Sequence, residues 1–90
     1  MRQAIYKVPE GKLLKVFLTA EEGKIKDVKI TGDFFMYPEE KIVLLEEAVK
    51  GMELNEEALK EKLEKIIVQE NLDLFGFDAG SIAKTMVMAG

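Results

Sequence analysis

The residues of this 90-residue chain that could do chemistry are carboxylates and lysines, because it contains no cysteine and no histidine. Disulfides, Cys/His zinc sites, cysteine nucleophiles and histidine bases are therefore excluded. Pairs of neighbouring glutamates occur at 21–22, 39–40, 46–47 and 56–57, in a turn or on expected helices. Adjacent side chains on a helix project about 100° apart, so such a pair cannot converge on a substrate as acid and base. We interpret these pairs as solvated surface.

Three single residues are further candidates, and each has a structural alternative. Lys12 follows Gly11 and could contact an anion, but one Gly-Lys step without a glycine-rich phosphate loop favours an ordinary surface lysine. Asp33 could bind a metal or act as a base, but we favour a carboxylate that accepts hydrogen bonds within its own turn. Ser81 is the only serine, and no plausible base lies near it in the sequence. Composition and spacing therefore indicate no complete active site.

The stretch Ile-Thr-Gly-Asp-Phe-Phe-Met-Tyr-Pro at 30–38 joins an expected strand to an expected helix. Neighbouring aromatic side chains tend to point to opposite sides, so we expect one of Phe34 and Phe35 to pack inward and the other to face a partner or cover the core. Burial of both is the alternative. The apolar residues of this stretch and of a later loop include Phe34, Phe35, Tyr37, Leu74 and Phe75. So much apolar loop surface favours an interaction role over an ordinary loop core.

The elements that must position these residues are three strands followed by three helices. Alternation of apolar and polar residues predicts strands over 4–8, 12–20 and 25–31, with residues 14, 16, 18 and 20 facing the core. Helices are predicted from Pro38 to a stop at Gly51, after Asn55 and after Asp78, and residues 71–77 are predicted to form a loop. The predicted fold class is α+β, with a three-stranded antiparallel sheet and about three helices packed on one face. Residues 1–90 form a single domain.

Charge and hydropathy exclude several partners. The net charge is −4 and no basic stripe is present, which argues against nucleic acid and anionic membranes as partners. The longest apolar runs have four residues, and the N-terminus has no apolar segment of signal-peptide length, so we expect no membrane span and a cytoplasmic protein. A chain of this size buries only about 60–65% of its unfolded surface, so a deep pocket of its own is not expected.

Three segments, in this order, resemble the C-terminal domain of lipoate-protein ligase. They are Lys-Val-Pro-Glu-Gly-Lys-Leu-Leu-Lys-Val at 7–16, Gly-Lys-Ile-Lys-Asp-Val-Lys-Ile-Thr-Gly-Asp-Phe-Phe at 23–35, and a helix with Leu45 and Glu46 that ends at Gly51. The hairpin leading into Gly-Asp-Phe-Phe is the most specific part. Glu10 departs from the Pro-Gly-Gly-Lys turn of the family.

The resemblance implies a function. In this family the domain is fused behind a catalytic domain or, in some archaea, is a separate accessory chain, and the start at Met1 fits the separate form. Lipoate and ATP give lipoyl-adenylate and pyrophosphate, and the lipoyl group then passes to a lysine of an acyl-carrier domain. The catalytic lysine and the lipoate and nucleotide contacts belong to the large domain. The resemblance therefore implies an accessory subunit that docks on the large catalytic subunit and supports adenylation. This chain would bind no cofactor alone, whereas the complex would use lipoate, ATP and Mg²⁺.

We expect the partner interface to lie around the 30–38 stretch. Phe34, Phe35 and Tyr37 are expected to supply its apolar surface, with Lys7 and Lys12 at the rim. The full set of interface candidates is Lys7, Lys12, Gly32, Asp33, Phe34, Phe35, Tyr37 and Phe75. The alternative is a non-catalytic regulatory or oligomerisation module of another cytoplasmic complex. An iron–sulfur scaffold, whose fold is similar to that of the family, is excluded by the absence of cysteine.

Overall fold

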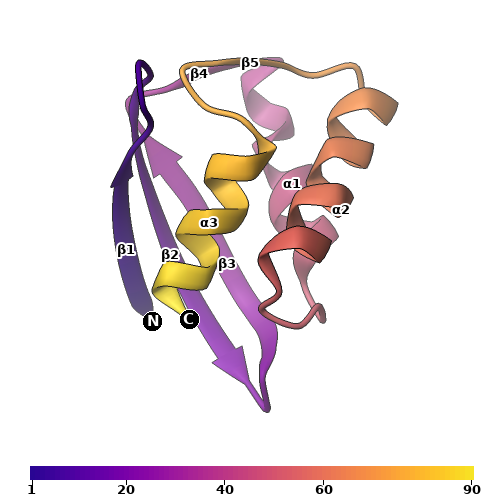
Figure 1. Cartoon of the computed structure of the whole chain (residues 1–90). Helices are drawn as coiled ribbons and strands as arrows, with labels where there is room; N and C mark the ends of the chain where they lie inside the picture. The colour runs from indigo at the N-terminus through magenta and orange to yellow at the C-terminus, as the bar shows by residue number, and fades with distance from the viewer.

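Three antiparallel strands form one layer of the computed structural model, which describes residues 1–90 (Figure 1). They are β1 (Arg2–Lys7), β2 (Leu13–Glu21) and β3 (Lys24–Gly32). β2 pairs with both neighbours, so the sheet order is β1-β2-β3. The strands begin and end within two residues of the predicted boundaries. The predicted α+β fold is confirmed.

The helices lie together on one side of this sheet (Figure 1). They are the 3₁₀ turn η1 (Glu39–Lys41), α1 (Ile42–Val49), α2 (Glu56–Gln69) and α3 (Ala79–Ala89). α3 packs on β1 and β2, α1 packs on β3, and α2 packs on α1 and α3. The predicted caps are present: Asn55 accepts from the Ala58 N–H at 3.0 Å, and Asp78 and Ser81 form a capping box. Ser81 therefore fixes the start of a helix.

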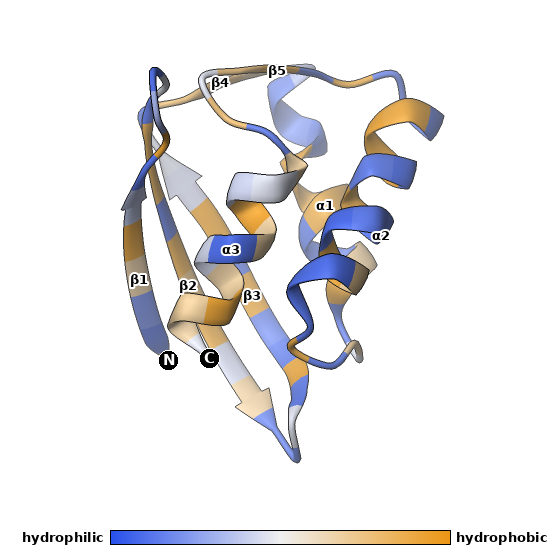
Figure 2. Cartoon of the chain, in the orientation of Figure 1, coloured by the Kyte–Doolittle hydropathy of each residue, from blue (hydrophilic) through white to orange (hydrophobic).

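The hydrophobic core fills the space between the sheet and the helices. Apolar and polar residues alternate along the strands (Figure 2), and Leu14, Val16 and Leu18 of β2 are fully buried. Ala20 was predicted on the same face, but it is exposed because the register of β2 and β3 shifts between Thr19 and Ala20. The fully buried residues on the helix side include Leu45, Val49, Leu59, Leu63, Ile82 and Met86.

Two segments differ from the prediction. Pro38 does not begin an α-helix but precedes η1, and α1 begins at Ile42. The predicted loop at 71–77 contains β5 (Asp73–Phe75), which pairs antiparallel with β4 (Phe35–Tyr37). Three residues are too few for an alternation pattern to reveal a strand, and pairing of such short strands depends on the rest of the fold. We call this two-stranded sheet the β4–β5 ribbon.

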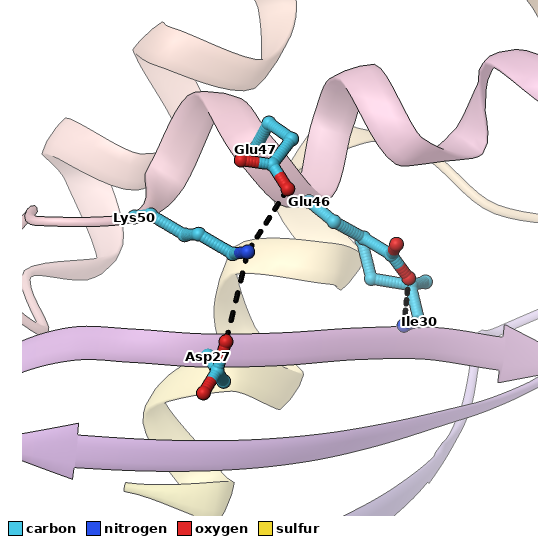
Figure 3. A network of polar contacts seen from close by, with 5 residues as sticks. All are labelled: Asp27, Ile30, Glu46, Glu47 and Lys50. Atoms are coloured by element: carbon cyan, nitrogen blue, oxygen red, sulfur yellow. Dashed lines mark hydrogen bonds and ion pairs between the residues drawn. The ribbon is translucent and has the colours of Figure 1, made fainter.

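The outer edge of β3 is covered by α1 and the segment that follows it. The Ile25 N–H donates to the Met52 carbonyl at 2.8 Å, and further along the strand the Ile30 N–H donates to the Glu46 carboxylate at 2.8 Å (Figure 3). Next to it, the hydrogen bond to Glu47 at 2.9 Å raises the pKa of Lys50, and Asp27 at 3.6 Å adds to the effect. These contacts attach α1 to the sheet edge.

Replacing Glu46 with Ala removes the acceptor of the Ile30 N–H, so we expect the free energy of unfolding to fall by about 1.5 kcal/mol in a urea titration. Glu47→Ala is the matched control, because Glu47 lies on the same turn of α1 but pairs only with the exposed Lys50. Its loss should be about 0.5 kcal/mol or less. Equal losses for the two variants would contradict the role of Glu46 at the strand edge.

Candidate docking surface

Three aromatic side chains share the outer side of the β4–β5 ribbon, which lies at the end of the sheet opposite both chain termini (Figure 1). Phe35 and Tyr37 are each 71% exposed, whereas Met36 between them is 6% exposed. Phe75 is 57% exposed and pairs directly with Phe35, while the half-buried Leu74 pairs with Met36. Alternate residues of a strand and directly paired residues share a side of the sheet. Phe35, Tyr37 and Phe75 therefore point outward together, and we call them the aromatic face.

Phe34 takes the opposite direction from Phe35. Its ring stacks on the ring of buried Phe77, with 3.9 Å between the centroids and 26° between the planes. The expectation that one of the two neighbouring phenylalanines packs inward is thus confirmed, and the inward one is Phe34. The role of either ring in partner binding stays a prediction.

The turn between β3 and β4 passes very close to β2. Gly32 has a φ of 150°, and a Cβ at this position would overlap the carbonyl oxygen of Leu13. The Asp33 N–H donates to that same oxygen at 3.0 Å. The Asp33 carboxylate is exposed and accepts no hydrogen bond from the chain, so the predicted side-chain turn is wrong. Its backbone N–H fixes the turn instead.

The two candidate lysines each contact a turn of the backbone. The Lys12 N–H donates to the Gly76 carbonyl at 2.8 Å, and carbons of its side chain lie against Gly76. The Lys7 ammonium donates to the carbonyls of Gly11 at 2.6 Å and Val8 at 3.1 Å. Glu10, which replaces a glycine of the family's turn, has a left-handed φ of 57°. Lys7 is thus bonded within its own turn, and its place at the rim of an interface stays a prediction.

An open cleft of about 280 Å³ lies beside the aromatic face, where β3, β4 and η1 meet. Its walls include Ile30, Thr31, Phe34, Phe35, Met36 and Ile42, and Glu39 is its only charged residue. Sequence reasoning missed Glu39, because it treats 39–40 as one solvated pair. Only Glu39 of that pair lines the cleft.

No three Asp or Glu side chains, Asp33 included, form a group that could hold a metal ion. None of the helices is both long and apolar enough to cross a membrane. The side of the sheet away from the helices carries Phe17, with the Lys15 ammonium 5.0 Å from its ring centroid.

A family model described as the C-terminus of bacterial lipoate protein ligase matches residues 6–86, which is most of the chain. The chain belongs to this family. The expected resemblance is therefore confirmed over residues 6–86, from the end of β1 into α3.

A curated protein and a chain of a solved structure, both from Thermoplasma acidophilum, are similar to this chain. Lipoate-protein ligase A subunit 2 is 44% identical over 46 residues, which span 51% of this chain and 48% of the relative. The match thus spans about half the length of that relative. A solved structure of an archaeal lipoylation system, a bipartite lipoate protein ligase and its E2 lipoyl domain, contains a chain that superposes with a TM-score of 0.78 at 26% identity. The superposition covers 92% of this chain and 90% of that chain.

Replacing Phe34 with Ala removes its stack on Phe77, so we expect the free energy of unfolding to fall by about 2–3 kcal/mol. Phe35→Ala is the matched control, because the neighbouring ring is exposed, and its effect should stay within about 0.5 kcal/mol. Urea unfolding followed by circular dichroism measures both values. A larger loss for Phe35→Ala than for Phe34→Ala would reverse the assignment of the two rings.

Replacing Gly32 with Ala puts a methyl group against the Leu13 carbonyl and forces a positive φ on a residue with a Cβ. We expect a loss of about 3 kcal/mol in the free energy of unfolding. Gly23→Ala is the control, because its φ is 79° but no atom lies within 4 Å of the new methyl group. That variant should lose only about 1–2 kcal/mol. Thermal unfolding compares the two variants. Equal melting temperatures would show that the contact of the new methyl group with the Leu13 carbonyl does not add to the loss of stability.

Proposed function

We propose that this chain is the accessory subunit of a two-component lipoate-protein ligase. It docks on the large catalytic subunit and supports ATP-dependent activation of lipoate to lipoyl-AMP for protein lipoylation. The observation that carries the proposal is the likeness, over 92% of this chain and 90% of the other, to a chain from a bipartite lipoate protein ligase. Family membership over residues 6–86 and the similarity to a ligase subunit 2 support it. The complex uses lipoate, ATP and Mg²⁺ in the cytoplasm, and the lipoyl-acceptor domain is an indirect partner.

The aromatic face is the docking surface in this proposal. Phe35, Tyr37 and Phe75 are exposed on a ribbon whose inner side is fixed to the core, so little conformational freedom is lost when a partner covers them. Burial of a large apolar side chain contributes about 1.5–3 kcal/mol. Aromatic residues also dominate the binding energy of protein interfaces. Three such side chains in one plane suit a stable contact with a second protein.

Docking supports adenylation through a shift in the conformational equilibrium of the large subunit. A bound subunit favours an ordered, closed active site only if it binds that state better than the open one. A difference of about 2–3 kcal/mol in binding free energy changes the closed population by roughly 30–150-fold. This mechanism needs no reacting group on the accessory chain, which agrees with the surface described above.

The reaction is tested by combining the purified large subunit of the same organism with lipoate, ATP, Mg²⁺ and the acceptor domain, with and without this chain. We expect pyrophosphate release and lipoylated acceptor to rise at least tenfold when the chain is present, and this chain alone to form no adenylate. An equal rate without the chain would overturn the proposal. ATP turnover by the chain alone would also overturn it.

The docking surface is tested by replacing Phe35 and Tyr37 with Ala. We expect the dissociation constant of the complex with the large subunit, measured by isothermal titration calorimetry, to rise at least tenfold for each variant. Met88→Ala is the control, because Met88 is 51% exposed but lies in the last turn of α3, at the opposite end of the molecule (Figure 1). Unchanged affinity of Phe35→Ala and Tyr37→Ala would place the contact elsewhere. Self-association of the isolated chain through these rings would favour an oligomerisation module.

A further inference from the structure

The cleft beside the aromatic face is sized for a side chain. Its volume of about 280 Å³ lies at the lower limit of the roughly 300–1,000 Å³ of pockets that enclose small molecules, and a single long side chain can occupy it. Phe35 belongs both to the cleft wall and to the aromatic face, so a protein that covers the aromatic face also covers the mouth of the cleft. The occupant therefore comes from the docked partner.

The chemistry of the cleft selects a cation with an apolar stem. Phe34, Met36 and Ile42 line it with apolar atoms, and Glu39 supplies its only charge. The Glu39 carboxylate takes part in none of the ion pairs or side-chain hydrogen bonds of the chain. The nearest lysine in sequence, Lys41, pairs instead with Glu70 at 3.6 Å. Glu39 is thus a carboxylate with no internal counter-ion at the edge of a cleft whose lining is partly apolar.

The half of the chain to which Glu39 belongs has a net negative charge. Residues 38–90 contain twelve acidic and six basic residues, whereas residues 1–37 contain five acidic and seven basic residues. The helical part of the chain, which begins at Glu39, therefore carries the excess negative charge. Such a field raises the local concentration of cationic groups and repels a partner's carboxylates.

We infer that the cleft receives an arginine side chain of the large subunit, and this inference rests on the proposed function. The aliphatic stem of the arginine lies against Phe34 and Ile42, and its guanidinium donates to the Glu39 carboxylate. The exposed ring of Phe35 offers a π face to the same planar group. Arginine fits better than lysine, because a guanidinium can pair with a carboxylate through two N–H groups and stack on an aromatic ring at the same time.

The experiment compares Glu39→Gln with Glu40→Gln in calorimetric titrations against the large subunit. Both variants lose one negative charge from neighbouring exposed residues of η1, but only Glu39 lines the cleft. We expect the dissociation constant to rise about tenfold for Glu39→Gln and less than about twofold for Glu40→Gln. Thermal unfolding should show that both variants remain folded. Equal effects of the two substitutions would indicate general electrostatics and overturn the inference.

The partner residue is found by replacing each surface arginine of the large subunit with Ala and repeating both titrations. One variant should bind wild type about tenfold more weakly and should no longer distinguish wild type from Glu39→Gln. Surface lysines are replaced in the same way. If no arginine variant, or only a lysine variant, binds wild type and Glu39→Gln equally well, the assignment of arginine is overturned. If wild type and Glu39→Gln bind equally well, the inference fails and the proposed function stands. If wild type does not bind the large subunit at all, the proposed function itself fails.

Discussion

The stack of Phe34 on Phe77 is the interaction on which the proposed binding surface depends. The β4–β5 ribbon has only three residues in each strand, and an isolated two-stranded ribbon is marginally stable at best. Its order therefore comes from its inner side, where the two rings are 3.9 Å apart and Met36 is buried. With the inner side fixed, Phe35 and its outward neighbours are held at a constant spacing, so a partner meets a preformed surface.

Two of the three segments that carry the family resemblance also meet in space around this ribbon. The turn at 8–12 supports it through the hydrogen bond from Lys12 to Gly76, and the Gly-Asp-Phe-Phe segment reaches β2 through the hydrogen bond from Asp33 to Leu13. A side chain at Gly32 would prevent that approach. The motif thus specifies backbone contacts that shape a surface.

Apolar and charged residues have different roles at the proposed interface. Burial of the aromatic face would supply affinity, but apolar contacts place little constraint on the orientation of the partner. The unpaired carboxylate of Glu39 beside it would fix that orientation. Glu39 lies where the basic sheet half and the acidic helical half of the chain meet. A partner with an apolar patch and one correctly placed cation would bind in a single register. Such a register is what a subunit needs if its binding is to favour one state of an active site.

The sequence by itself determined the elements whose signals are local. Alternation predicted the three strands of the main sheet, cap residues such as Asn55 and Asp78 predicted two helix starts, and the Phe34-Phe35 pair predicted one inward and one outward ring. Only the tertiary structure decided the pairing of β4 with β5 and the difference between Glu39 and Glu40. The physical reason is the sequence distance over which each interaction acts. Periodicity and caps act within a few residues, whereas three-residue strands far apart in sequence pair only after the core has brought them together.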